Sequence, residues 1–137
     1  MLRYVLDASV AVAWYLPDES ERYASMLLER IEDSQIVVPA IWPAETANAL
    51  LSAERRGRSS REATDCFIDS LRSLPIEVAS ESDLASLPSL LALARENGLT
   101  AYDASYLRTA LGFGLSLATL DERLRSAARR SGIELTA

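Results

Sequence analysis

Two residue types that carry much of enzyme chemistry are missing from this chain. Its 137 residues include no histidine, and all 14 basic residues are arginine, so there is no lysine either. Without histidine there is no Ser-His-Asp triad and no imidazole base. Without lysine there is no P-loop and no Schiff base. Carboxylates are the strong ligands that remain in number, and sites rich in oxygen suit Mg²⁺ or Mn²⁺.

Cysteine and long apolar runs are also scarce. The single cysteine, Cys66, excludes an internal disulfide bond, and its apolar neighbours in a helical pattern predict a buried thiol. The longest apolar stretch, Ala8 to Leu16, is too short to cross a bilayer. It also lacks the basic segment and cleavage site of a signal peptide. We therefore expect a cytoplasmic protein that does not enter a membrane.

Length and charge favour one ordinary domain covering residues 1–137. The hydrophobic content of 49% is enough for a sizeable core. The net charge is −6, from 20 acidic and 14 basic residues, which argues against a general binder of polyanions. A divalent cation bound to a cluster of acids would cancel part of this charge and leave the arginines to shape the local field.

Strand-like and helix-like segments alternate along the chain. The predicted strands cover Leu2–Leu6, Gln35–Val38, Ile76–Val78, Leu115–Ala118 and Ile133–Leu135. The predicted helices cover Ala8–Tyr15, Glu19–Glu32, Pro43–Arg56, Ser59–Ser73, Glu81–Asn97, Ala101–Leu111 and Asp121–Arg130. Short connections between alternating elements predict an α/β fold, in which a central, mainly parallel five-stranded sheet lies between two layers of helices.

Four acids occupy related positions in this arrangement. Asp7 directly follows the first predicted strand, and Asp121 comes three residues after the fourth. Glu45 and Asp103 lie in the first turns of helices, where the helix dipole stabilises negative charge. Ligands of parallel sheets bind beyond the carboxyl ends of the strands. We therefore expect the four carboxyl groups to meet there and to hold a divalent metal ion.

Each acid also has a simpler interpretation. Asp7 and Asp121 are good helix N-caps, Asp103 forms half of a capping box with Thr100, and Glu45 is an ordinary first-turn acid. Against this, Asp7 lies in a run with almost no other polar residue, and a buried carboxylate is costly unless it is paired or bound to metal. The coincidence at four sites favours the metal site.

Four short stretches carry a resemblance to a known family. They read VLDAS at 5–9, PAETANAL at 43–50, AYDASYL at 101–107 and LATLD at 117–121. Their order and flanks resemble the motifs of PIN-domain ribonucleases, and the chain's size is similar to that of the VapC toxins of type II toxin–antitoxin modules. The resemblance covers essentially the whole chain. It implies a PIN-like three-layer α/β/α sandwich, a Mg²⁺- or Mn²⁺-dependent endoribonuclease, a homodimer and a VapB-type antitoxin that occludes the active site.

The resemblance also assigns roles to residues. It implies that Asp7 and Asp103 are the principal metal ligands, that Asp121 acts through a water molecule or at a second metal ion, and that Glu45 lies near the attacking water. Three polar side chains occupy positions where relatives place groups that support the ligands or contact phosphate: Thr119, Ser9 and Asn48.

The expected chemistry is hydrolysis of a phosphodiester bond. Two carboxylates about 4 Å apart repel by about 4 kcal/mol at an effective dielectric constant near 20, so a cation between them is favourable. With the cation bound, Glu45 orients or deprotonates the water that attacks phosphorus. This leaves a 5′-phosphate and a 3′-hydroxyl. Single-stranded or looped RNA is the expected substrate, with tRNA and rRNA as candidates.

Three alternatives remain open from the sequence. The same site would serve a non-toxin PIN nuclease in RNA processing, which differs by having no partner gene. A dehalogenase-like phosphohydrolase with Asp7 as nucleophile fits poorly, because the second aspartate of that motif and the required lysine are missing. A catalytically inactive PIN-fold binding module, whose acids only cap helices, would not bind Mn²⁺ saturably.

Overall fold

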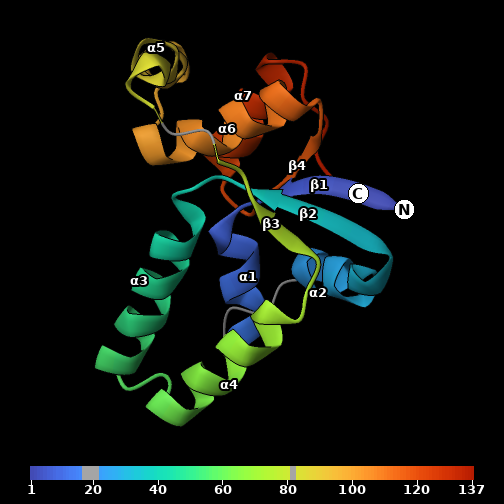
Figure 1. The fold of residues 1–137 in the computed structure, drawn as a ribbon, viewed down its shortest axis with the longest axis vertical. Coiled ribbons are helices and arrows are strands. Elements are labelled where there is room, and N and C mark those ends of the chain that lie inside the picture. The colour runs from blue at the N-terminus through green and yellow to red at the C-terminus, as the bar shows by residue number, and fades with distance from the viewer. Residues whose placement is uncertain (17–21, 81–82) are drawn as a thin grey trace.

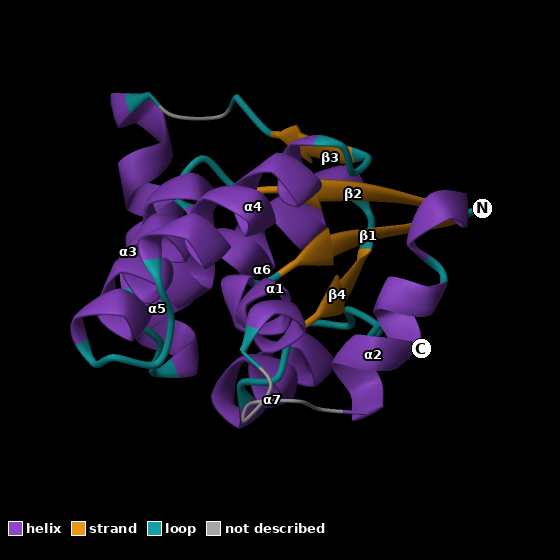
Figure 2. Ribbon diagram, turned by 90° about the horizontal axis from the view of Figure 1, so that it is seen from below, coloured by secondary structure: helices purple, strands orange, loops and turns teal. Residues whose placement is uncertain are grey.

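A sheet of four parallel strands runs through the centre of the computed structural model, which describes residues 1–16, 22–80 and 83–137. The strands are β1 (Leu2–Leu6), β2 (Ser34–Val38), β3 (Ile76–Val78) and β4 (Ser116–Ala118). Their order across the sheet is β3-β2-β1-β4, and every pair is parallel. The carboxyl ends of β1 and β4 therefore lie next to each other at one edge of the sheet (Figure 2).

Helices cover both faces of this sheet (Figure 1). One layer contains α1 (Ala8–Tyr15), α2 (Arg22–Glu29), α3 (Trp42–Arg55) and α4 (Arg61–Arg72). The other layer contains α5 (Leu87–Asn97), α6 (Ala101–Phe113) and α7 (Glu122–Arg130). The predicted α/β/α sandwich is confirmed. No helix among the described residues is long and apolar enough to cross a membrane.

The central strand β1 is buried on both faces. Tyr4, Val5 and Leu6 are fully buried, and Leu107 of α6 and Leu124 of α7 belong to the same core. A strand covered on both faces reads as a continuous apolar run, which is why the last three residues of β1 show no alternation, whereas Leu2 and Arg3 at its start are less buried. This strand leads directly to Asp7, so the chain places a carboxyl group at the end of its most buried strand.

The sheet has four strands and not the five that were predicted. The segment predicted as Ile133–Leu135 pairs with β4 at one position only, through a parallel bridge between Leu117 and Leu135. Two backbone hydrogen bonds form it, from Leu117 N to Glu134 O at 3.0 Å and from Thr136 N to Leu117 O at 2.9 Å. Ile133 is buried, but a ladder needs further paired residues that this segment does not have.

Helix boundaries differ from the prediction where local chemistry intervenes. The helix predicted over Glu81–Asn97 is divided into a short 3₁₀ helix, η3 (Leu84–Ser86), and α5, because Pro88 suits the first turn of a helix and not its interior. Helix α6 continues past Gly112 to Gly114, which has a left-handed conformation. The start of the helix predicted over Glu19–Glu32 lies outside the described residues, and its described part, α2, ends at Glu29.

One prediction about the core is wrong. Cys66 is exposed on α4, and its thiol is not buried. The reason is that only a narrow side of α4 packs against the rest of the protein, since Thr64 is its one buried residue. The helix begins with Ser60 as its N-cap, one residue after the predicted Ser59.

Candidate functional site

A cavity of about 570 Å³ opens where β1 and β4 end. Four separate segments contribute its acidic lining: the β1–α1 junction, the first turn of α3, the first turn of α6 and the turn before α7. The acids are Asp7, Glu45, Asp103 and Asp121. We call this space the acidic cavity. The structure thus brings together all four acids that the sequence singled out.

Asp7 occupies the N-cap position of α1 without capping the helix. Its side chain accepts no hydrogen bond from the helix backbone, and it is only 7% exposed. The backbone N–H of Asp7 donates to the carbonyl oxygen of Ala118 at 2.9 Å, which extends the β1–β4 ladder by one residue. The simpler interpretation of Asp7 as a cap therefore does not account for its burial.

Two hydroxyl groups hold the Asp7 carboxylate instead. Ser9 Oγ and Thr119 Oγ1 both donate to Asp7 Oδ2 at 2.7 Å. Each hydroxyl oxygen in turn accepts a backbone hydrogen bond, from Leu120 N at 3.1 Å to Ser9 and from Asp121 N at 3.0 Å to Thr119. Because the backbone donors occupy the acceptor sides, the hydroxyl protons are directed at Asp7. Ser9 and Thr119 therefore both hold the Asp7 carboxylate in place.

The charge on Asp7 is incompletely compensated. Burial raises the pKa of Asp7 to about 6, and the negative charges of Glu45 and Asp103 add to this increase. The bonds from Ser9 and Thr119 act in the opposite direction. Burial also raises the pKa of Asp103 above its ordinary value. A cation in the acidic cavity would favour the ionised forms of both groups.

Glu45 is held by a residue that the sequence analysis did not select. Tyr106 Oη donates to Glu45 Oε1 at 2.6 Å, and the Tyr106 ring is fully buried. Burial and then the bond to Glu45 raise the pKa of Tyr106 far above its ordinary value of 10, so the phenol stays protonated as a donor. The sequence spacing did indicate that Tyr106 lies near the site. Tyr106 follows Asp103 by three residues and so lies one turn further along α6, on the same face.

Asp103 and Asp121 lie at the starts of two helices. Thr100 caps α6 by accepting from the backbone N–H of Asp103 at 3.1 Å, as the capping box predicted. Asp121 caps α7 by accepting from Arg123 N at 2.9 Å. Asp121 therefore has the capping role of the simpler interpretation and also lines the acidic cavity. Both acids are partly exposed, and solvent reaches them.

Asn48 is not brought to this site. Its side chain is exposed on α3, and the neighbouring Ala49 lines the acidic cavity in its place. Its predicted contact with ligands or phosphate stays a prediction.

The lining of the acidic cavity fits a hard divalent cation in its chemistry. Its charged groups are carboxylates, and carboxylate oxygens are the ligands that Mg²⁺ and Mn²⁺ prefer. Among the described residues, no three acidic side chains are close enough to one another, in their present conformations, to coordinate one ion together. Repulsion between like charges favours that separation when no cation lies between them. The residues that would hold the ion are Asp7, Glu45, Asp103 and Asp121.

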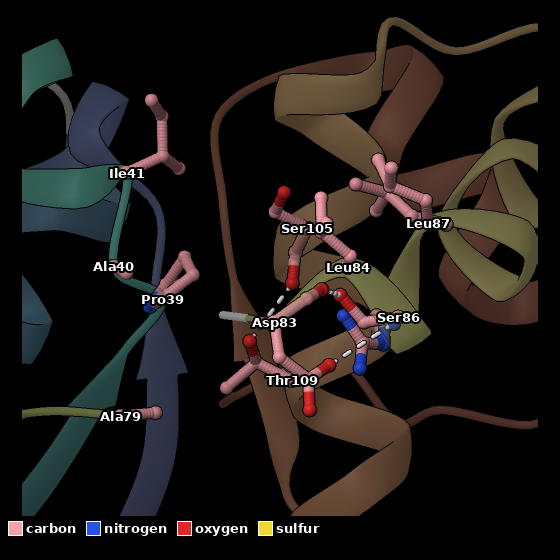
Figure 3. A pocket seen from close by; sticks show the side chains of 12 residues that line it. Pro39, Ala40, Ile41, Ala79, Asp83, Leu84, Ser86, Leu87, Ser105 and Thr109 are labelled. Carbon is pink, nitrogen blue, oxygen red and sulfur yellow. Dashed lines mark hydrogen bonds between the residues drawn. The ribbon is translucent and has the colours of Figure 1, made fainter. Parts of the chain in front are cut away.

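A second cavity has nearly the same volume but a different lining. It measures about 550 Å³ and lies between the segment after β2 and the η3–α5 region, with α6 along one side (Figure 3). Three leucines line it, Leu84, Leu87 and Leu90, and we call it the leucine-lined cavity. Asp83 is the one acid among its described lining residues.

The PIN-domain family matches residues 4–130 of the sequence. This chain is a PIN domain. The matched segment includes all four acids of the acidic cavity and both hydroxyl groups that hold Asp7. The family assignment therefore covers the whole candidate site.

Two sequence relatives of this PIN domain are ribonucleases by name. Ribonuclease VapC3 of Pyrobaculum aerophilum is 29% identical over 123 residues, which cover 90% of this chain and 92% of the relative. Ribonuclease VapC3 of Mycobacterium tuberculosis is 34% identical over 125 residues, which cover 90% of this chain and 85% of the relative.

Solved structures share the fold. The crystal structure of PAE2754 from Pyrobaculum aerophilum superposes with a TM-score of 0.72 and 26% identity, over 92% of this chain and 84% of that one. VapBC2 from Rickettsia felis, bound to a DNA fragment from its promoter, gives a TM-score of 0.67 and 16% identity, over 98% of each chain. At that identity the second likeness concerns the fold alone.

Proposed function

We propose that this PIN domain is a Mg²⁺- or Mn²⁺-dependent endoribonuclease and the toxin of a type II VapBC pair. The observation that carries the proposal is the acidic cavity, in which four carboxyl groups from four separate segments line one space. The VapC3 ribonucleases to which the chain is similar support RNA as the substrate. The absence of histidine and lysine from the whole chain leaves these acids as its strongest ligands.

The four acids have separate roles in this proposal. Asp7 and Asp103 would hold the metal ion, and Asp121 would hold it through a water molecule or bind a second ion. The ion, when bound, neutralises the carboxylates and polarises the phosphodiester group. Glu45, fixed by Tyr106, orients and accepts a proton from the water that attacks phosphorus.

The products follow from water as the nucleophile. Attack by water in line with a departing 3′-oxygen, which takes up a proton, leaves the phosphate on the 5′ side and a 3′-hydroxyl group, without any need for the RNA 2′-hydroxyl. A single-stranded or looped RNA segment suits the acidic cavity best. Its flexible backbone can bring a phosphate group to the carboxyl groups, whereas a duplex is stiffer. Transfer RNA and ribosomal RNA are the candidates to test first.

A protein partner belongs to the same proposal. The Rickettsia felis neighbour is a VapBC2 complex, and we propose a VapB-type antitoxin for this chain, acting on a homodimer in the cytoplasm. An antitoxin that inserts a basic side chain into the acidic cavity would compete directly with the metal ion.

The proposal is tested by mapping RNA ends after incubation with the purified protein. We expect cleavage in Mg²⁺ or Mn²⁺, none in EDTA, and products with 5′-phosphate and 3′-hydroxyl ends. Cleavage that continues in EDTA would contradict the metal mechanism. Calorimetric titration with Mn²⁺ tests the alternative of a catalytically inactive binding module, which predicts no saturable binding of the ion.

A second experiment separates a toxin from a housekeeping nuclease. We expect expression of the chain alone to arrest growth, and co-expression with a neighbouring gene to restore it. Normal growth together with metal-dependent cleavage in vitro would favour the non-toxin nuclease.

A further inference from the structure

Tyr106 is the fully buried tyrosine whose hydroxyl group reaches the acidic cavity. Its ring packs in the core with no exposed surface, and its hydroxyl donates to Glu45 Oε1 at 2.6 Å. The bond joins α6 to α3, two helices on opposite faces of the sheet, across 61 residues of sequence. A hydrogen bond between a phenol and a carboxylate at this length is strong, because one partner is charged.

The position of Tyr106 connects three acidic segments. It follows Asp103 by one helical turn on α6, so the same helix that presents Asp103 also restrains Glu45. The backbone of Ala8, the residue after Asp7, lies near the Tyr106 hydroxyl. A shift of Tyr106 would therefore change the relative positions of carboxyl groups from α6, α3 and the β1–α1 junction together.

We propose that Tyr106 is a positioning residue that fixes the Glu45 carboxylate in the orientation required for hydrolysis. This inference rests on the proposed nuclease function for its kinetic consequence, and on geometry alone for the orientation of Glu45. A glutamate side chain has three rotatable bonds, and a solvated one samples many conformations. The Tyr106 bond holds one of the two carboxylate oxygens and leaves the other free to act on water.

A purely structural role for Tyr106 makes a different prediction. A tyrosine that only fills the core would lose stability on mutation but would leave the Glu45 side chain and the turnover number unchanged. The chain provides a matched control in Tyr4, which is also fully buried. The Tyr4 hydroxyl makes no hydrogen bond of good geometry among the described residues, although it lies near the Ser34 hydroxyl, which donates to the carbonyl oxygen of Arg30.

The experiment compares Tyr106→Phe with Tyr4→Phe, because each change removes one hydroxyl group and keeps the ring. In the metal-free protein, the side-chain carboxyl carbon of Glu45 is observed by ¹³C NMR and assigned with Glu45→Gln. We expect this signal to move in Tyr106→Phe and to stay in place in Tyr4→Phe. An unchanged Glu45 signal in Tyr106→Phe would overturn the inference, whether or not the protein cleaves RNA.

Steady-state kinetics give the second readout. We expect Tyr106→Phe to lower kcat by about 10- to 100-fold, the usual effect of losing a group that orients an active-site residue, and to leave KM within about twofold. Tyr4→Phe should keep both constants. Failure of the wild-type protein to cleave RNA would reject the proposed function, whereas wild-type cleavage with an unchanged kcat in Tyr106→Phe would reject the role of Tyr106.

Discussion

The acidic cavity and the leucine-lined cavity have nearly equal volumes, about 570 and 550 Å³, but they differ in the hydrogen bonds that hold their polar side chains. In the acidic cavity two of the four acids are held by distant parts of the sequence, in addition to short-range bonds such as that from Ser9 to Asp7. Thr119 reaches Asp7 across 112 residues, and Tyr106 reaches Glu45 across 61. These long-range bonds fix functional side chains relative to one another.

In the leucine-lined cavity the polar side chains bond locally. Asp83 Oδ1 accepts from Ser86 N at 3.1 Å, which caps η3. Thr109 Oγ1 donates to the carbonyl oxygen of Ser105 at 2.8 Å, within its own helix. These bonds support the elements that carry them, and neither joins two distant segments of the chain. Cavity volume thus says little about chemistry, whereas the sequence separation of the hydrogen bonds distinguishes the two sites.

The largest expected difference between the cavities comes from removing one acid in each. Asp7→Asn should lower metal-dependent RNA cleavage by at least roughly 1,000-fold, because a metal ligand is lost. The matched change Asp83→Asn should leave cleavage unchanged, since asparagine also caps helices well. Initial rates at saturating Mg²⁺ measure both. Equal effects of the two substitutions would contradict the distinction between the cavities.

The second effect is on stability and depends on pH. The pKa of Asp7 rises from an ordinary 3.8 to about 6 in the folded protein, so folding binds a proton between these values. The metal-free protein should therefore lose roughly 2 kcal/mol from this group as the pH rises from about 4.5 to about 7.5. Urea unfolding in EDTA at pH 4.5 and pH 7.5 measures the change.

Other groups titrate in the same range, so Asp7→Asn serves as the reference for that experiment. The free energy of unfolding of Asp7→Asn does not include the titration of Asp7. That of the wild-type protein should therefore decrease relative to the variant as the pH rises. A difference between the two proteins that does not vary with pH would mean that Asp7 has an ordinary pKa.

The third comparison uses two buried threonines: Thr119, which holds Asp7 of the acidic cavity, and Thr109, which lines the leucine-lined cavity. Thr119→Val removes a donor to Asp7 and the acceptor for Asp121 N, and should lower cleavage by about 10- to 100-fold and stability by about 1–3 kcal/mol. Thr109→Val removes only a bond within one helix, and should cost less than about 1 kcal/mol and leave cleavage unchanged. Thermal unfolding and initial rates of the two variants decide the matter.

The smallest expected effect lies outside both cavities. Gly114 ends α6 with φ of +65°, and a Cβ built there would meet no atom within 4 Å. Gly114→Ala should therefore cost about 1 kcal/mol through backbone conformation alone, with cleavage rates unchanged. A drop in cleavage would show that the end of α6 influences Asp103 at its start.

The positions of the four acids were predictable because they depend on topology. Once the strands are known to be parallel, their carboxyl ends share an edge, and Asp7 and Asp121 must lie there. The helix starts at Thr100 and Asp121 were predictable for a related reason, since capping involves residues only two or three apart. Local rules and sheet topology were sufficient for these features.

The partners of buried groups were not predictable in the same way. A tyrosine inside a helix reads as core, and Tyr106 is indeed core, but the destination of its hydroxyl depends on how α3 and α6 pack. The exposure of Cys66 depends on how narrowly α4 contacts the sheet layer. The prediction of a fifth strand was wrong because an apolar pattern does not determine how many residues pair, and this segment meets β4 at one bridge only.

The bond between Asp7 and Thr119 has a consequence for the newly made chain. Asp7 leaves the ribosome before Thr119, which follows it 112 residues later. Until then its carboxyl group lacks Thr119. Asp103 emerges late in that interval and Asp121 only after it. The acidic cavity therefore assembles only after Asp121 has been made, and a product truncated before that residue would lack a complete site.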